Sequence, residues 1–356
     1  MLEYQYLITE RNPTMPTKRV TMQDIADASG LSRNTVSKVF NGRGTVPQST
    51  RELILRKAAE LGYGTPAEAQ PSAVRSGGSI ALLTSDMPRD FHFGTIFMTS
   101  VTDQISRAGY TLKIFEVSPE ELKQKKLPPH FYADQISGMV GIELFDPAYL
   151  DMITSLGQPI IMIDGPAHAF AEPMACDFVT MENVSGIVSV VRRMHGKGAR
   201  RIGFVGDREH CASFFERWVG YTSALNILGI PLDEKICLLM PDGSPVDDPD
   251  WLTGELDRMS ALPDAFACVN DYQAIHLMNA LRKKGLRIPE DVMVAGFDGT
   301  SQAALVDPPL STVRILSTEM GRMAADLLLF RIRSPEMPYV WIRVRTEPVW
   351  RRSTRD

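Results

Sequence analysis

The stretch VTMQDIADASGLSRNTVSKVFNGRGTV, residues 20–46, decides how the amino-terminal part of this chain folds. Thr21, with Asp24 three residues later, is typical of a helix start, because the two side chains can cap the free backbone amides there. Ile25 and its small neighbours give this helix an apolar side, and Gly30 is typical of a helix end. The sequence therefore predicts a short amphipathic helix that begins after Thr21 and ends at Gly30.

A second helix is predicted directly after this glycine. Ser32 can cap it, and Val36, Val39 and Phe40 follow at the spacing i, i+3 and i+4, so one side of the helix is expected to be buried. Two helices joined by so short a turn form a helix-turn-helix, in which the first residues of the second helix meet base edges in the major groove of DNA.

The other side of the second helix is polar and carries Arg33, Asn34 and Lys38. Arginine and lysine donate to guanine O6 and N7, and asparagine pairs with adenine N6 and N7, with about 1–3 kcal/mol of discrimination for each good bidentate pair. Short polar side chains nearby suit phosphate contacts, which set the register without reading bases. A surface hairpin with solvated polar residues is the alternative, and it would be preferred for two such helices in isolation.

The wider pattern favours DNA binding. From the Val-Thr opening through TVSKVFNG to the closing Gly-Tyr at 62–63, the sequence resembles the DNA-binding head of the LacI/GalR family of transcription regulators. The resemblance includes a third helix with an apolar stripe formed by Ile54, Ala58 and Leu61. By position, it implies base contacts by Arg33, Asn34 and Lys38. It implies contacts with the DNA backbone by Thr35, Ser37, Asn41 and Thr45.

Charge is unevenly distributed along the 356 residues, whose net charge is −5. Residues 18–64 carry eight basic and four acidic side chains, so a small basic head precedes an acidic body. This asymmetry indicates a polyanion as the partner of the head alone. The length predicts more than one domain, since single cores rarely grow beyond about 250–300 residues.

Membrane, disulfide-rich and metal-binding proteins are disfavoured. No run approaches the roughly 20 consecutive apolar residues that cross a bilayer, and residues 1–17 lack the order of a signal peptide, so a cytoplasmic protein without membrane contact is expected. The cysteines Cys176, Cys211, Cys237 and Cys268 lie far apart, without the spacing of a disulfide framework or a zinc site. They are expected to be free buried thiols, and no metal or cofactor is expected.

Two segments of the chain depart from the resemblance. Residues 1–17 have no counterpart in the family, so a start of translation at Met15 and a disordered tail are both open. Residues 65–78 form the predicted linker, where Ser72 stands at the position of the family's hinge-helix leucine and Pro71 disfavours a helix. The linker is interpreted either as a flexible tether or as a minor-groove contact through a neighbouring apolar residue.

The rest of the chain alternates strand-like and helical patterns. The strand-like runs include SIALLTSD, QPIIMIDG, RRIGFVGD and VMVAGFDG. This alternation predicts parallel sheets with crossover helices, and ligands of such sheets bind beyond the carboxyl ends of the strands. Polar residues stand at several of these ends: Asp86, Asp164, Asn270, Asp271 and Asp298.

Residues 79–352 also resemble the LacI/GalR effector domain, which has the two-lobed fold of periplasmic sugar-binding proteins. Segments such as ERWVGYTSAL, VNDYQA, VAGFDGT and MGRMAADLLL carry the resemblance. It implies an all-α helix-turn-helix head plus an α/β two-lobed, periplasmic-binding-protein-like effector domain, which also dimerises. The first lobe is expected to comprise about 79–178 and 313–337, and the second about 179–310 and 338–352.

By the same resemblance, a small-molecule effector binds between the lobes. Arg217 matches the family's ligand arginine, whose planar guanidinium can hold two hydroxyls or a carboxylate, and an ion pair with Glu216 or another surface acid is the alternative. Asp298 and Asn270 match polar ligand positions, with turn chemistry at strand ends as their alternative role. The remaining candidates are Ser213, and the aromatic residues Phe93 and Phe91, which could pack against a sugar or base face.

Two other classes of protein share α/β lobes. An enzyme is disfavoured because the sequence has no GxSxG elbow, Walker loop, HExxH or GxGxxG after a strand, and its six histidines fall in no catalytic pattern. A periplasmic solute-binding protein is disfavoured by residues 18–64 and by the lack of an export signal. The sequence predicts a transcriptional repressor that binds double-stranded DNA at a near-palindromic operator as a homodimer. Its effector is expected to be a sugar or a related metabolite.

Overall fold

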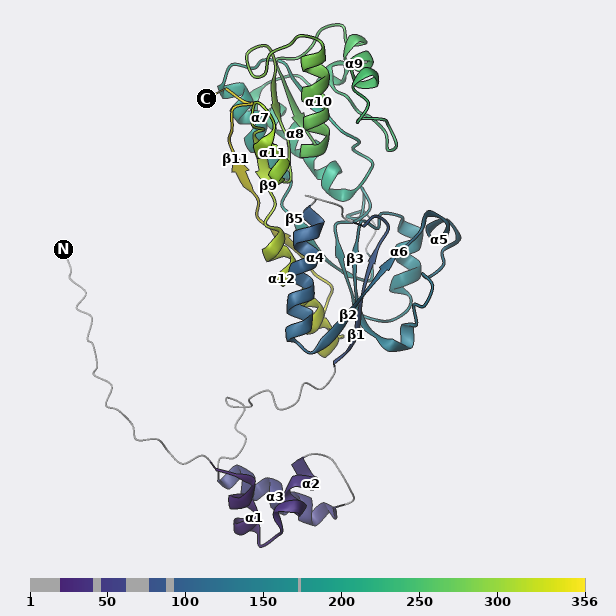
Figure 1. The fold of residues 1–356 in the computed structure, drawn as a ribbon, viewed down its shortest axis with the longest axis vertical. Helices are drawn as coiled ribbons and strands as arrows, with labels where there is room; N and C mark the ends of the chain where they lie inside the picture. Colours follow the sequence, from purple (N-terminus) through teal and green to yellow (C-terminus); the bar gives the residue numbers. More distant parts are fainter. Residues whose placement is uncertain (1–19, 41–45, 62–76, 88–92, 172–173, 356) are drawn as a thin grey trace, which may run out of the picture. The chain divides into compact units, whose positions relative to one another are not determined.

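The computed structural model of the chain describes residues 20–40, 46–61, 77–87, 93–171 and 174–355. These residues belong to two compact units, Met1–Val74 and Arg75–Asp356, called here the head and the body. Each unit is described separately (Figure 1). The predicted tail at 1–17 and almost all of the predicted linker lie outside the described residues.

The head contains three helices, α1 (Met22–Ser29), α2 (Arg33–Phe40) and α3 (Gln48–Glu60). The predicted capping box is present, because Asp24 N donates to Thr21 Oγ1 and Thr21 N donates to the Asp24 carboxylate. Gly30 ends α1 with φ at 70°, a left-handed conformation that glycine adopts without strain.

A small apolar core holds the three helices together. It consists of Ile25, Ala26, Val36, Val39, Ile54 and Ala58, each at most 6% exposed. Two residues that were expected in this core are not buried, since Phe40 is 36% and Leu61 is 38% exposed. Phe40 is the last residue of α2 and Leu61 follows the last residue of α3, so neighbouring helices cover only part of each side chain.

The first lobe of the body is built on a six-stranded sheet with the order β10-β5-β4-β3-β1-β2. Every pair of neighbouring strands is parallel, as the alternation of patterns predicts. The strands are β1 (Gly77–Thr84), β2 (Tyr110–Glu116), β3 (Ile136–Ile142), β4 (Ile160–Ile163), β5 (Asp177–Met181) and β10 (Trp341–Val344). The helices are α4 (Phe93–Arg107), α5 (Pro119–Gln124), the short 3-10 helix η1 (Ala133–Gln135), α6 (Pro147–Thr154) and α12 (Ser317–Arg333).

Helices cover both faces of this sheet, because its strands are apolar on both sides (Figure 1). α4 and α12 lie side by side on one face, where Phe97 packs in the same cluster as Ile80. α6 covers the other face, where Tyr149 packs in the same cluster as Leu83. The helices α4 and α12 approach closely, since a Cβ added at Gly321 would lie 2.7 Å from the carbonyl oxygen of Phe97.

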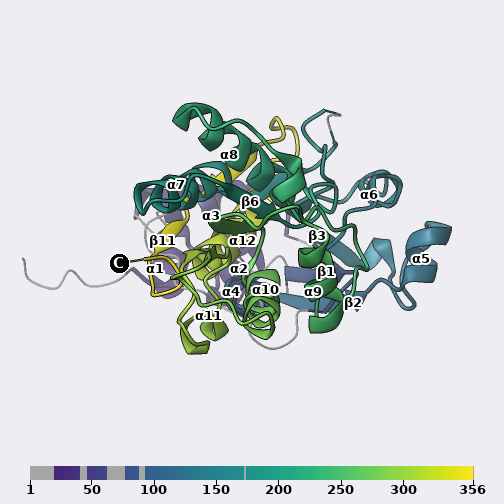
Figure 2. The same ribbon diagram turned by 90° about the horizontal axis from the view of Figure 1, so that it is seen from above.

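The second lobe has a three-stranded parallel sheet with the order β6-β7-β8. Its strands are β6 (Ile202–Val205), β7 (Ala265–Cys268) and β8 (Met293–Ala295), and β9 (Thr312–Arg314) pairs antiparallel with β11 (Glu347–Val349). Its helices are α7 (Val184–Gly196), α8 (Ala212–Leu228), η2 (Glu234–Ile236), α9 (Pro249–Asp257), α10 (Asp271–Lys283) and α11 (Ser301–Leu305). Seen from above, α7 and α8 lie on one side of β6, and α10 and α11 lie on the other (Figure 2).

The chain passes between the two lobes three times: after β5, between β9 and α12, and between β10 and β11. Backbone hydrogen bonds join neighbouring crossing segments, and Glu182 N donates to the carbonyl oxygen of Val344 at 2.7 Å. Because three crossing segments link the lobes, a change in the position of one lobe can be transmitted to the other.

The expected division of the lobes differs from the structure in part of one segment. Residues 338–352 were expected in the second lobe; β10 instead pairs with β5 in the sheet of the first lobe, whereas β11 pairs with β9 in the second lobe. The cause is Asp177, a fully buried residue at the start of β5 that forms an ion pair with Arg331 of α12. Its carboxylate also accepts from Val340 N at 2.8 Å, which holds the start of β10 beside β5.

Candidate DNA-reading face and effector cleft

The face of α2 that was predicted to read bases is exposed. Arg33, Asn34 and Lys38 are exposed, whereas Val36 and Val39 on the opposite side are buried in the head core. Arg33 and Asn34 occupy the first turn of α2, where unpaired backbone amides favour anions such as phosphates. The head therefore exposes cationic and amide side chains on one face of α2.

The residues predicted to touch the DNA backbone fall into two groups. Thr35 and Ser37 are half-buried at the edge of the same face. The Thr35 amide donates to Ser32 Oγ at 3.1 Å, so Ser32 caps α2 as predicted. Asn41 and Thr45 lie outside the described residues.

In the body, Arg217 of α8 is almost completely buried, with 2% exposure. Its Nε donates to Asn183 Oδ1 at 2.9 Å, and its Nη1 donates to the carbonyl oxygen of Val269 at 2.6 Å. The guanidinium carbon lies 3.8 Å from the ring centre of Phe297, at cation–π distance. These contacts fix the plane of the guanidinium before any ligand arrives.

The carboxylate partner of Arg217 is Asp298, and the alternative pairing with Glu216 is not formed. Asp298 Oδ1 lies 3.5 Å from Arg217 Nη1. Glu216 instead pairs with Arg343 at 2.7 Å and accepts a hydrogen bond from Asn183. The structure thus brings together Arg217 and Asp298, two of the predicted effector-binding residues.

A second pair of residues joins the lobes directly. Asp164 follows β4 of the first lobe, and Ser213 lies in the first turn of α8 of the second lobe. Ser213 Oγ donates to Asp164 Oδ2 at 2.5 Å, and the Ser213 amide donates to Asp164 Oδ1 at 3.0 Å. The Ala212 amide also donates to the carbonyl oxygen of Gly165 at 2.8 Å. The end of β4 is therefore docked on the amino-terminal turn of α8.

Acidic groups surround the single guanidinium of this cluster. Burial, together with the carboxylates of Asp164 and Asp86, raises the pKa of Glu143 to about 8, although Arg217 acts in the opposite direction. Burial likewise raises the pKa of Asp298 well above its usual value, Arg217 opposes this, and Asp271 and Glu143 add to it. The cleft therefore contains more carboxyl groups than cations, and protonation relieves part of their repulsion.

Glu143 was not among the predicted site residues. It follows β3 with φ at 55°, a left-handed conformation that is uncommon for a residue with a side chain. The feature of the sequence that could have identified Glu143 as a site residue is its place at the carboxyl end of the strand-like run SGMVGIEL. Asp164 has the same signal and stood among the polar strand ends, although it was not assigned to the effector.

The other predicted effector residues have different surroundings. Asn270 Oδ1 caps α10 by accepting from the Gln273 amide at 2.9 Å, which is the alternative role predicted for it. Phe93 begins α4, but its side chain is outside the described part of the structure, and so is the whole of Phe91. No described contact joins the Asn270 side chain to Arg217 in the residues that the structure covers.

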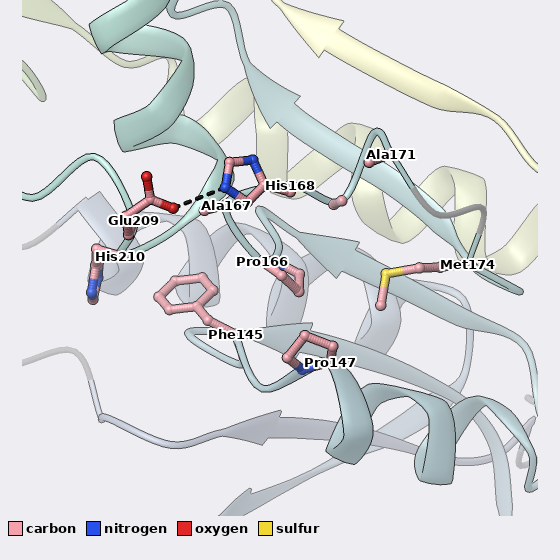
Figure 3. A pocket seen from close by; sticks show the side chains of 10 residues that line it. Phe145, Pro147, Pro166, Ala167, His168, Ala171, Met174, Glu209 and His210 are labelled. Atoms are coloured by element: carbon pink, nitrogen blue, oxygen red, sulfur yellow. Dashed lines mark hydrogen bonds and ion pairs between the residues drawn. The ribbon is translucent and has the colours of Figure 1, made fainter.

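A cavity of about 360 Å³ lies next to these residues (Figure 3). Its walls follow β3, β4 and β6 and include Phe145, Pro166, His168, Met174 and His210. The predicted effector residues with described side chains do not line it. Sequence reasoning missed this cavity, because its aromatic and histidine residues lie in irregular segments without a periodic pattern.

Further expectations concern metals, thiols and membranes. Within the described residues, no group of histidine, cysteine or acidic side chains could hold a metal ion. All four cysteines are free thiols, of which Cys237 is only half-buried. Among the helices described, none is long and apolar enough to cross a bilayer.

Two family profiles match this chain. Residues 21–66 match the profile of bacterial regulatory proteins of the lacI family, and residues 191–354 match that of a periplasmic binding protein-like domain. The first match covers the three helices of the head, and the second covers most of the second lobe together with the returning carboxy-terminal segments.

Relatives of this chain are transcription regulators. The HTH-type transcriptional regulator CelR of Thermobifida fusca is 27% identical over 88% of this chain and 92% of its own length. The ribose operon repressor of Bacillus subtilis (strain 168) is 26% identical over 94% of this chain and 98% of its own length.

Solved structures share the fold over nearly the whole chain. The complex of CelR with cellobiose matches 94% of this chain and 100% of its own, at 26% identity and a TM-score of 0.67. The lac repressor dimer bound to operator and an anti-inducer matches 95% of this chain and 99% of its own, at 23% identity and a TM-score of 0.68. The predicted fold class is confirmed, and the chain combines a head that matches the lacI family of bacterial regulatory proteins with a periplasmic binding protein-like domain.

Proposed function

We propose that this protein represses transcription by binding a near-palindromic operator as a homodimer, and that a small molecule in the interlobe cleft controls its affinity for the operator. The effector is a sugar or a related polyol. The observation that carries the proposal is the buried Arg217 cluster, which joins polar groups from the carboxyl ends of strands in both lobes of a chain that begins with a helix-turn-helix head.

The head supports the DNA-binding part of this proposal. Arg33, Asn34 and Lys38 project from α2 and serve as the base-reading residues. Thr35 and Ser37 contact phosphates, with Asn41 and Thr45 assigned to the same role from the sequence. Two heads on a two-fold dimer would place their recognition helices about 34–36 Å apart, one helical turn of DNA.

The cleft supports a polyhydroxylated effector. Sugar hydroxyls both donate and accept hydrogen bonds, so they suit a site that holds carboxylates together with one guanidinium. Arg217, Asp298 and Ser213 bind the effector, with Asp164 and Glu143 as additional acceptors or donors. Asn270 contributes through its amide nitrogen, because its oxygen is engaged in the cap of α10. Phe93 and Phe91 are assigned from the sequence to stack on the ligand.

The same contacts offer a route from ligand to DNA. A ligand hydroxyl that competes with Ser213 for Asp164 alters how β4 of the first lobe meets α8 of the second. A change in lobe closure then changes how the two heads of a dimer are presented to the operator. To alter operator affinity tenfold, the coupling free energy must reach about 1.4 kcal/mol.

The body also offers a surface for dimerisation. α4 and α12 carry large apolar side chains that remain exposed, namely Ile96 at 55%, Met323 at 38% and Phe330 at 39%. Apolar side chains on two helices packed side by side suit a contact between two copies of the chain.

The protein acts on DNA in the cytoplasm and catalyses no reaction, in keeping with relatives that are transcription regulators.

The DNA-binding assignment is tested with operator fragments selected from a random duplex library. Arg33→Ala should lower discrimination at one operator position by about 5–150-fold, because each bidentate pair contributes about 1–3 kcal/mol. Ser37→Ala should weaken all fragments nearly equally. Fluorescence anisotropy of variant operators measures both effects, and equal losses on every sequence for both variants would contradict the assigned roles.

The effector assignment is tested by operator release in the presence of sugars, polyols and nucleosides. Arg217→Ala should retain operator affinity and lose the response to the effector. Arg282→Ala, an exposed arginine on α10, is the matched control and should respond normally. A normal effector response in Arg217→Ala would move the effector site elsewhere.

A further inference from the structure

The cavity in Figure 3 has no role in the effector site described so far. We infer that it is the second compartment of that site and holds one ring of the effector, so that the effector is an uncharged two-ring glycoside. The inference rests on the proposed function, because it adds a second compartment to the effector site around Arg217. Size, position, wall chemistry and charge support it independently.

The cavity has room for a ring of the effector. Ligand pockets in proteins have volumes of roughly 300–1,000 Å³, and this cavity has about 360 Å³ without the Arg217 cluster. A one-ring effector would fill the polar cleft and leave the cavity filled with water. An effector with a second ring would bury apolar surface there.

The cavity lies close to the Arg217 cluster. Both are formed by segments that follow β3 and β4, at the edge of parallel sheets where ligands bind. Rings in contact lead from one to the other. Phe145 lies 5.0 Å from His210, His210 lies 4.9 Å from Phe214, and the ring of Phe214 lies 5.6 Å from the guanidinium carbon of Arg217.

The walls suit the two kinds of surface that a pyranose ring presents. Phe145, Pro147, Pro166 and Met174 offer apolar surface to the C–H face of a ring (Figure 3). Polar groups stand at the rim, where His168 Nε2 pairs with Glu209 Oε2 at 2.8 Å between the two lobes. Such groups can exchange hydrogen bonds with ring hydroxyls.

The charge of the cleft selects against anions. Glu143, Asp164 and Asp298 gather around one guanidinium, which is already paired with Asp298. A phosphate or carboxylate on the effector would bring negative charge into a buried site whose one guanidinium already has a carboxyl partner, among carboxyl groups that resist ionisation. Sugar phosphates should therefore bind worse than the corresponding uncharged sugars.

The test measures ligand affinity in the full-length protein by thermal shift and calorimetry. The uncharged two-ring probes are cellobiose, lactose and p-nitrophenyl β-D-glucoside, and the one-ring probes are glucose, galactose and ribose. Glucose 6-phosphate and ribose 5-phosphate are the anionic probes. The largest stabilisation should come from an uncharged two-ring probe.

Two variants locate the second ring in the cavity. Phe145→Ala removes one apolar wall and should raise the Kd of the best two-ring probe about tenfold. Ala171→Phe adds a ring at an exposed position on the rim and should raise the same Kd by a similar factor. Ala304→Phe, at an exposed position of α11, is the matched control and should change this Kd less than twofold.

Several outcomes would overturn the inference. They are a best ligand with one ring or a phosphate group, a panel in which no two-ring probe stabilises the protein, and unchanged affinity in both Phe145→Ala and Ala171→Phe. A one-ring ligand that binds both variants normally and is lost in Arg217→Ala would leave the proposed function standing. Ligands that bind the cleft without changing operator affinity would instead contradict the proposed function.

Discussion

Replacing Glu143 with glutamine tests whether the cleft holds a protonated carboxyl group near neutral pH. Burial and the carboxylates of Asp164 and Asp86 raise the pKa of Glu143 from 4.5 to about 8 in the folded protein. Between these two values, the folded protein binds a proton that the unfolded chain releases. The contribution of Glu143 to stability therefore falls as pH rises through this window. Glutamine does not titrate, so the stability of the variant lacks this pH-dependent decrease.

The size of the effect follows from the pKa shift. Each pKa unit corresponds to 1.36 kcal/mol, so a shift from 4.5 to about 8 amounts to on the order of 5 kcal/mol over the whole window. Between pH 5 and 8 the expected difference is roughly 3–4 kcal/mol. Since each kcal/mol moves Tm by about 2–4 °C in a domain of this size class, Glu143→Gln should gain on the order of 10 °C relative to the original protein across that range.

The assay is thermal unfolding of the ligand-free protein at pH 5, 6, 7 and 8 in buffers of equal ionic strength. Other groups titrate in both proteins, so only the difference between the two curves reports on Glu143. Glu116→Gln, at an exposed position that ends β2, is the matched control and should follow the original curve. Parallel curves for Glu143→Gln and the original protein would refute the reasoning.

Two further predictions concern the packing that positions the cleft. Asp177→Asn should lower the free energy of unfolding by about 3–5 kcal/mol, because it leaves Arg331 buried without its counter-charge. In urea unfolding followed by tryptophan fluorescence, adding Arg331→Met should recover part of this loss, and purely additive losses would argue against the pair. Gly321→Ala should lower stability by about 1–3 kcal/mol, because its Cβ would meet the backbone of α4. Gly254→Ala in α9 is the control, since nothing lies within 4 Å of its added Cβ, and it should raise stability by about 0.4–1 kcal/mol.

The effector site shows where sequence reasoning succeeds and where it stops. Arg217, Asp298 and Ser213 could be named from the motifs that contain them, and the structure pairs Arg217 with Asp298 and joins Ser213 to Asp164 of the first lobe. Glu143 could not be assigned in this way, because its pKa depends on carboxylates and a guanidinium contributed by other segments. The same limit applies to Phe145, whose neighbour His210 is brought to it from the other lobe.

Local patterns of residues were sufficient to predict the head and the alternating α/β character of the body. Caps, glycine ends and apolar spacing act over a few residues, so Thr21, Gly30, Val36 and the strand-like runs indicate local structure without distant partners. Three other properties became visible in the folded chain: the sheet that β10 joins, the raised pKa of Glu143 and the cavity near the Arg217 cluster. These properties depend on burial and on charges brought together from distant parts of the chain, which no local pattern of residues records.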